Sequence, residues 1–248
     1  MKKFFVLALM AALLTALPAT AQKIYVNGID PNYPPFAYVD EKTGKPSGFD
    51  VESMDWIAKT MGFQVEHKPM AWDGIIPALL GKQIDMVCSG MSITPQRARQ
   101  VTFSESYWQV YRVFLVRANA NLSPQSILNG KEMQIGVQRG TSEANDIMQE
   151  KKEKGYEFTL RFYDSAPLAV EDLINGRIGA ALMDDLPARD ALAKGRPVKI
   201  VGAHGDSDDF GVAMRKEDEA LHRLINEGYR RLKASPYWKE LQVKYLSK

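Results

Sequence analysis

Apolar residues along the chain follow two spacings, one typical of helices and one typical of buried strands. In residues 49–61 they recur every three to four positions, which predicts a helix that Gly62 ends. Residues 84–88 form a short, mostly apolar run, which predicts a buried strand. Strands are expected at 23–28, 63–67, 84–88, 111–117, 134–137, 159–163, 178–183, 199–202 and 210–214, and helices at 49–61, 75–80, 142–152, 166–175, 216–233 and 237–245. This alternation predicts the α/β class with a largely parallel sheet.

The predicted elements occur twice in the same order. Residues 76–88 (IPALLGKQIDMVC) and residues 170–182 (VEDLINGRIGAAL) both read as a helix, a turn with glycine and a basic residue, and a buried strand. Two similar α/β units joined by extended segments indicate two lobes with a cleft between them. Because ligands of open α/β sheets bind beyond the carboxyl ends of the strands, polar residues at those ends are candidates for a site.

The first 21 residues are expected to be a cleavable export signal. Lys2 and Lys3 precede an apolar run at 4–17, and residues 19–21 (ATA) have the small side chains of a cleavage site. The apolar run is short for a membrane span. We therefore expect the mature chain to begin at Gln22 and to be exported to the periplasm.

Charge and cysteine content exclude several classes of function. Removing Lys2 and Lys3 takes the formal net charge from +2 to about 0, which is not the basic balance of a nucleic-acid-binding protein. Cys88 is the only cysteine, so no internal disulfide can form, and its apolar context indicates a buried side chain. The three histidines are scattered and no nucleophile elbow or phosphate loop occurs, so no catalytic residue, metal or cofactor is expected.

The segment that follows the predicted strand 84–88 is rich in hydrogen-bond donors. Ser89 and Ser92 supply hydroxyl groups, and Thr94 with the proline after it is typical of a helix start. Arg97 then adds a guanidinium group suited to a carboxylate. The alternative is an ordinary capped helix with Arg97 on the surface.

Two further strand ends carry polar groups. Residues 138–142 (QRGTS) open a helix and could bind an anion, and Asp184 follows the strand 178–183, where its carboxylate could bind an ammonium group. The alternative for this acidic pair is a helix N-cap, a role that suits Asp185 better. Together with Arg97, these sites predict a receptor for a zwitterion.

An aromatic pair and one carboxylate could enclose the rest of such a ligand. Asp30 and Tyr33 lie in a proline-rich loop, and Trp72 precedes the predicted helix 75–80. Aromatic faces stack on apolar groups and on cations. For Tyr33 and Trp72, packing in the core remains the alternative.

In these features the sequence resembles the periplasmic amino-acid-binding proteins of ABC transporters, solute-binding protein family 3. The resemblance covers essentially the whole mature chain, and its markers are DPNYPPF (30–36), GFD (48–50), WDGIIPAL (72–79), SGMSIT (89–94), Arg97, GV with GT (136–137, 140–141) and FGVAMRK (210–216). It implies a two-lobed type II periplasmic-binding-protein fold with two hinge strands. We expect lobe 1 at 22–110 and 210–248, and lobe 2 at 111–209.

The resemblance also assigns roles to the candidate residues. It pairs Arg97 with the α-carboxylate of an L-amino acid and Asp184 with the α-amino group, while Tyr33 and Trp72 sandwich the side chain. Asp30 lies where family members meet a polar or cationic ligand end. The predicted ligand-binding set is Asp30, Tyr33, Trp72, Ser89, Gly90, Ser92, Arg97, Gln138, Thr141, Ser142 and Asp184.

Two departures from the family pattern bear on the ligand. Gln138 stands where the basic-amino-acid receptors have an apolar residue, and Gly90 stands where they have a serine. Asp30 with two aromatic residues favours arginine, lysine or ornithine, whereas Gln138 leaves glutamine or another polar amino acid open. The expected partners are a free L-amino acid and a cognate ABC permease, with the protein a monomer. The alternatives are an enzyme similar to cyclohexadienyl dehydratase, which shares this fold, and a ligand-sensing partner of a membrane sensor.

Overall fold

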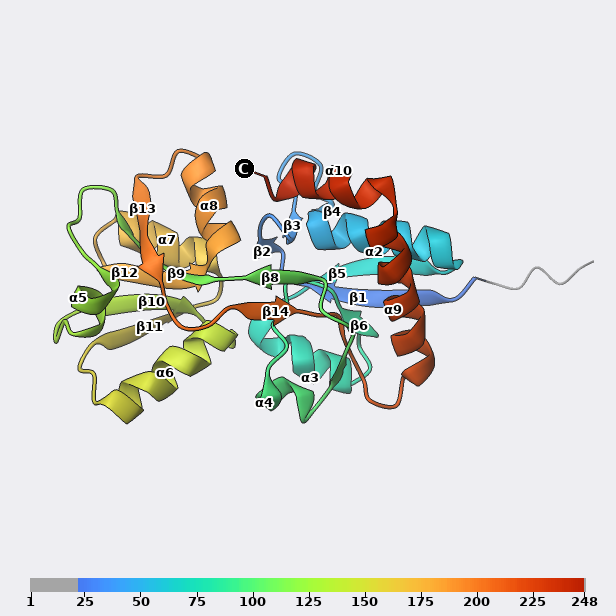
Figure 1. Ribbon diagram of the computed structural model, residues 1–248, viewed down its shortest axis with the longest axis horizontal. Helices are drawn as coiled ribbons and strands as arrows, with labels where there is room; N and C mark the ends of the chain where they lie inside the picture. Colours follow the sequence, from blue (N-terminus) through green and yellow to red (C-terminus); the bar gives the residue numbers. More distant parts are fainter. Residues whose placement is uncertain (1–21, 248) are drawn as a thin grey trace, which may run out of the picture.

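The computed structural model describes residues 22–247, which form two lobes side by side, each with its own five-stranded sheet (Figure 1). The expected signal segment, residues 1–21, lies outside the described residues. No helix within residues 22–247 has both the length and the apolar character of a membrane span.

The lobe that contains the N-terminal strand is called lobe 1. Its sheet has the order β5-β1-β6-β15-β7, with β1 parallel to β5 and β6, and β15 antiparallel to β6 and β7. Helices α2, α9 and α10 pack together, and α3 packs against β1 and β6. The elements are β1 (Ile24–Ile29), β2 (Asn32–Tyr33), β3 (Ala37–Val39), β4 (Pro46–Ser47), α2 (Phe49–Met61), β5 (Gln64–Pro69), the 3-10 turn η1 (Trp72–Gly74), α3 (Ile75–Leu80), β6 (Met86–Val87), α4 (Pro95–Ala98), β7 (Thr102–Phe103), β15 (Ala213–Met214), α9 (Glu219–Ala234) and α10 (Pro236–Tyr245).

Lobe 2 contains the sheet β11-β10-β12-β9-β13, in which β10 is parallel to β11 and β12, and β9 is antiparallel to β12 and β13. Alternation along β9 builds both faces: Val113 and Leu115 pack in one apolar cluster, and Phe114 and Val116 in the other. The elements are β9 (Arg112–Arg117), α5 (Pro124–Leu128), β10 (Gln134–Gln138), α6 (Ser142–Lys154), β11 (Thr159–Tyr163), α7 (Ala166–Ile174), β12 (Ala180–Asp184), α8 (Asp185–Ala193) and β13 (Val198–Ala203).

Two extended strands run between the lobes. They are β8 (Trp108–Val110) and β14 (Asp208–Phe210), which pair antiparallel (Figure 1). The two-lobed α/β fold with two connecting strands that the sequence predicts is therefore confirmed.

Some predicted elements differ from the structure. The expected strand at 210–214 is two strands, because the chain turns at Gly211 and Val212, whose backbone N–H groups bond Met91 and Ser104 in place of a ladder partner. The expected helix at 216–233 begins only at Glu219. Helices α5 and α8 were not predicted.

Candidate functional site

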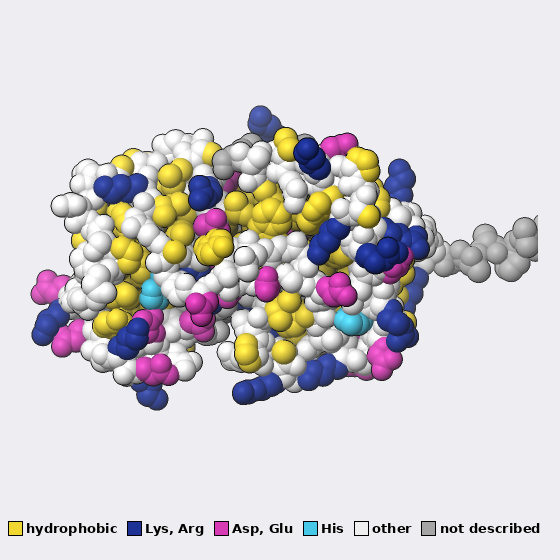
Figure 2. Space-filling model, in the orientation of Figure 1, with side chains coloured by type: hydrophobic (Ala, Val, Ile, Leu, Met, Phe, Trp, Pro, Cys, Tyr) yellow, Lys and Arg dark blue, Asp and Glu magenta, His cyan; other side chains and the backbone are white. Residues whose placement is uncertain are grey.

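A small cavity lies where the two lobes meet, and all eleven predicted residues line it together with Glu143. Its lining residues are Asp30, Tyr33, Trp72, Ser89, Gly90, Ser92, Arg97, Gln138, Thr141, Ser142, Glu143 and Asp184. Figure 2 shows the two lobes meeting, with a notch between them at the lower edge of this face, and basic and acidic side chains scattered over both lobes.

Arg97 is held inside the cavity by the short helix α4. Thr94 caps this helix, as predicted, by accepting a hydrogen bond from the Arg97 backbone N–H at 3.2 Å. The guanidinium group donates to the Ser92 carbonyl at 2.9 Å and to the Gly140 carbonyl of lobe 2 at 3.1 Å. It also lies 5.5 Å from the centre of the Trp72 ring. Since only 6% of Arg97 is exposed, the alternative of a surface arginine is wrong.

Asp184 ends β12 and stands at the N-cap position of α8, but its side chain makes no cap hydrogen bond. Its Oδ2 atom instead accepts from the Tyr33 hydroxyl of lobe 1. Within the described chain its Oδ1 atom is buried and has no hydrogen-bond partner. Burial, and then the nearby Glu143 carboxyl, raise the pKa of Asp184 well above its usual range. The Asp184 carboxyl group can therefore accept a further hydrogen bond and pair with a cationic group.

Asp30 is the second buried carboxyl group, and its partners are neutral. Gln138 of lobe 2 donates to Oδ2 at 2.7 Å, and the Asn32 backbone N–H donates to Oδ1 at 2.9 Å. Across residues 22–247 no lysine or arginine forms an ion pair with it. Burial raises the pKa of Asp30. The Ser89 hydroxyl accepts from the Asp30 backbone N–H at 2.9 Å, which connects the two loops.

Gly90 fits a position that a larger residue could not occupy without rearrangement. Its φ of +61° lies in the left-handed region, and a Cβ atom there would come within 2.3 Å of the Tyr33 ring. The Tyr33 ring also stacks on Phe36, with centroids 5.7 Å apart. Glycine at this position thus leaves space for the aromatic ring.

The N-terminus of α6 forms the lobe 2 wall. Thr141 caps the helix, accepting from the Ala144 backbone N–H at 3.3 Å. The Ser142 hydroxyl lies 3.0 Å from the Ser92 hydroxyl of lobe 1. This wall places the N-terminus of a helix, which carries partial positive charge, beside the cavity.

Glu143 is a cavity residue that the sequence analysis missed. It is 5% exposed, and burial raises its pKa while Arg97 opposes that rise. Acidic residues are common in the first turn of a helix because they interact favourably with the helix dipole, so the sequence position of Glu143 did not mark it as a cavity residue.

Asp208 is a second residue beside the cavity that the sequence analysis did not propose. In the structure Asp208 belongs to β14, and its Oδ1 lies 2.6 Å from Arg112 at the start of β9. Ser142 donates to its Oδ2 at 2.8 Å. Arg112 also pairs with Asp146 of α6 at 2.6 Å. An ion-pair network therefore joins the connecting strands to the cavity wall.

The sequence pattern that defines the bacterial extracellular solute-binding proteins, family 3, matches residues 25–248. The chain belongs to this family. The L-arginine-binding protein of Pseudomonas aeruginosa is a relative in it, 32% identical over 257 residues, which cover 100% of this chain and 97% of the relative.

Solved structures of amino-acid-binding proteins agree with this assignment. An ancestral arginine-binding protein bound to arginine superposes with a TM-score of 0.84 at 30% identity, covering 91% of this chain and 99% of the other. An ancestral amino-acid-binding protein, a precursor of cyclohexadienyl dehydratase, gives a TM-score of 0.81 at 30% identity, covering 90% and 96%.

Proposed function

We propose that this family 3 protein is a receptor that binds one free L-amino acid in the cavity between its lobes. One observation carries the proposal: a buried guanidinium group, Arg97, and a buried carboxyl group with an unused oxygen, Asp184, line the same cavity. Such a pair matches the α-carboxylate and α-ammonium groups of an amino acid. Buried charges of this kind need partners, and a zwitterion supplies both.

In this proposal the α-carboxylate pairs with Arg97 and with the N-terminus of α6 at Thr141 and Ser142. The α-ammonium group pairs with Asp184, the Ser92 hydroxyl and the Gly90 carbonyl. A planar guanidinium group binds a carboxylate through two parallel hydrogen bonds, which fixes the orientation of the ligand. The N-terminus of α6 adds partial positive charge beside the carboxylate.

We propose that the ligand is a basic amino acid, such as arginine, lysine or ornithine. Asp30 is buried and bonded only to neutral groups, so a cationic side chain would supply the charge it lacks. Tyr33 and Trp72 would flank that side chain. The arginine-binding relatives support this choice, whereas the amide of Gln138 would suit glutamine.

The same proposal covers the setting of the receptor. After removal of residues 1–21 it would act in the periplasm as a monomer and deliver its ligand to an ABC permease. Residues 22–110 and 210–248 would move as one lobe and residues 111–209 as the other, with β8 and β14 as the hinge. We propose a receptor and not an enzyme, since Arg97, Asp184 and Asp30 all serve binding.

A thermal-shift screen of residues 22–248, refolded to remove bound ligand, tests the proposal. At a hundred times its dissociation constant, a ligand stabilises the folded state by about 2.7 kcal/mol. Arginine, lysine or ornithine should raise the melting temperature, and glutamine alone would overturn the basic ligand while keeping the receptor. A shift with prephenate and none with any amino acid would favour the dehydratase alternative.

A further inference from the structure

Asp50, a buried carboxyl group outside the cavity, lies in the first turn of α2. It is 0% exposed, and no lysine or arginine of residues 22–247 pairs with it. Its Oδ2 atom accepts two hydrogen bonds, from the Gly90 backbone N–H at 2.6 Å and from the Tyr107 hydroxyl at 2.8 Å. Its Oδ1 atom has no partner in the described chain.

The two donors belong to segments that matter for ligand binding. Gly90 lines the cavity, and its left-handed backbone must be held against the Tyr33 ring. Tyr107 comes directly before β8, and its backbone N–H donates to Phe210 of β14 at 2.9 Å. One carboxyl oxygen therefore joins the cavity turn to the start of the proposed hinge.

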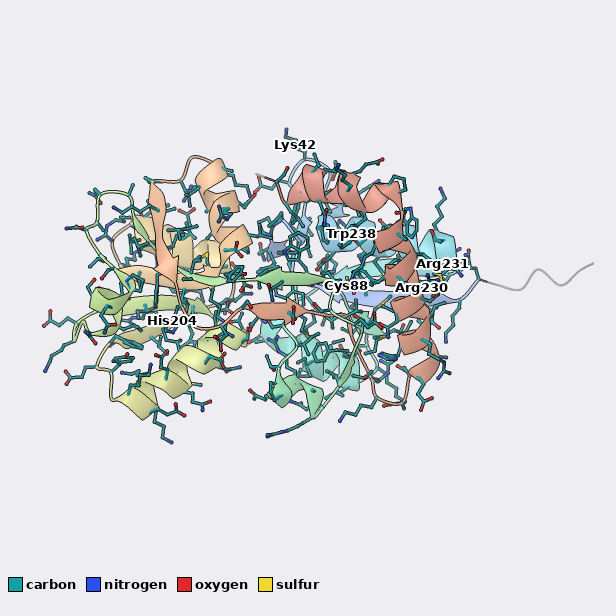
Figure 3. All side chains as sticks on the ribbon, viewed as in Figure 1. Lys42, Cys88, His204, Arg230, Arg231 and Trp238 are labelled. Carbon is teal, nitrogen blue, oxygen red and sulfur yellow. The ribbon has the colours of Figure 1, made fainter. Side chains whose placement is uncertain are left out.

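The other groups around Asp50 are neutral. The Tyr107 ring stacks on Tyr229 of α9 with centroids 5.0 Å apart, and the Tyr229 hydroxyl lies 3.2 Å from the Cys88 sulfur. Figure 3 shows Cys88 inside lobe 1, close to α9. Tyr33, beside Gly90, is the remaining titratable group that senses the charge on Asp50. Burial raises the pKa of Asp50 to about 7, and the bonds from Tyr107 and Gly90 oppose that rise.

We infer that Asp50 is a positioning residue that, when ionised, holds the Gly90 turn in its ligand-binding geometry and ties it to β8. The inference rests on the proposed function, because it is the Gly90 carbonyl that would meet the ligand's ammonium group. Hydrogen bonds to an ionised acceptor are about twice as strong as neutral ones. Protonation of Asp50 weakens both bonds at once, so ligand affinity falls as the pH falls through about 7.

Isothermal titration of arginine and of glutamine into the mature chain from pH 5.5 to 9 tests this inference. We expect Asp50→Asn to bind at least about tenfold more weakly than wild type at pH 8, by the loss of roughly one charge-assisted bond. It should also lose the inflection near pH 7. Asp55→Asn, a change of the same type at an exposed position of the same helix, is the matched control. It should keep the wild-type affinity and the inflection near pH 7.

Tyr107→Phe decides the case even if Asp50→Asn does not fold. The Tyr107 hydrogen bond lowers the pKa of Asp50, so its loss should move the inflection in affinity to higher pH. A purely structural role for Asp50 predicts no such movement. Wild-type affinity and pH profile in Asp50→Asn, or an unmoved inflection in Tyr107→Phe, would overturn the inference. No binding of either amino acid by the wild type would overturn the proposed function itself, and the inference with it.

Discussion

Replacement of Asp184 by asparagine removes one negative charge from the cavity and leaves the shape of the side chain. The amide oxygen of the new side chain would still accept from the Tyr33 hydroxyl, so the geometry of the lobe contact is kept. The unused Oδ1 becomes an amide nitrogen that cannot bind an ammonium group. We therefore expect the change to act on ligand affinity and not on the fold.

The size of the effect follows from two opposing terms. Removing one partner of a buried charge pair costs roughly 2–5 kcal/mol of binding free energy. Against this, the raised pKa means that wild-type Asp184 must be deprotonated as the ligand binds, and asparagine avoids that cost. At pH 7 we expect a loss near the lower limit, about 30- to 100-fold in the dissociation constant. The loss should grow from pH 6 to pH 7.5, because Asp184 in the free wild-type protein is more fully ionised at the higher pH while the ammonium group of the ligand is still charged.

The stability of the ligand-free protein should change in the opposite direction. An acid whose folded pKa is raised stabilises the fold below its unfolded pKa, and that stability is lost as the pH rises through the folded pKa. Asp184 therefore destabilises the free protein at pH 8, and Asp184→Asn should melt no lower than wild type.

Isothermal titration at pH 6, 7 and 7.5, with melting curves of the free proteins, measures both effects. Asp190→Asn, on the outer part of the same helix and paired with Lys194, is the matched control and should bind like wild type. A loss below threefold at pH 7.5, or an equal loss in Asp190→Asn, would refute the role given to Asp184.

Three further changes test other parts of the cavity and its supports. Asp30→Asn should weaken arginine binding tenfold or more, by roughly 1.5–3 kcal/mol for a charged hydrogen bond, yet change glutamine affinity little; equal losses in titrations of both ligands would contradict a cationic side-chain site. Gly90→Ala should lower stability by roughly 1–3 kcal/mol because of its φ of +61° and the contact at 2.3 Å with Tyr33; a wild-type denaturation midpoint would refute this strain argument. Asp50→Asn should flatten the fall in melting temperature from pH 4 to 7, because in that window the unfolded chain has released the Asp50 proton while the folded protein, with a pKa raised to about 7, still holds it; an unchanged slope would show that Asp50 does not titrate there.

The cavity could be predicted because its residues follow strand ends and begin helices. Thr94 and the proline after it mark the start of α4, which places Arg97, and Asp184 follows a recognisable buried strand. These are local signals, read within a few residues. In open α/β sheets, ligands bind beyond the carboxyl ends of the strands, so these residues can be assigned to one site before any contact between them is known.

What the sequence could not give are the contacts between distant segments. The bond between Tyr33 and Asp184 joins residues 151 positions apart, and the one between Asp30 and Gln138 joins residues 108 apart. The break in the predicted strand 210–214 also depends on such a contact, since the Val212 backbone N–H donates to the hydroxyl of Ser104, a residue 108 positions away. An apolar run shows that residues are buried, but not which sheet or linker buries them.

The cross-lobe contacts explain how a ligand would act on the balance between open and closed forms. Four hydrogen bonds join the lobes at the cavity: Tyr33 to Asp184, Gln138 to Asp30, Arg97 to the Gly140 carbonyl, and Ser92 with Ser142. Each involves a residue that the proposal assigns to the ligand, so binding exchanges protein partners for ligand partners at the same groups. The net gain in binding free energy is then the difference between the bonds made to the ligand and the bonds lost within the protein. It is largest for a cavity group that has no partner in the protein. Such a group is Asp184 Oδ1, which has no partner among residues 22–247, and an ammonium group there adds a bond without displacing one. Binding of the α-amino group therefore adds a bond at Asp184, at the cost of deprotonating it, whereas the Arg97 contacts within the protein are partly replaced by the ligand.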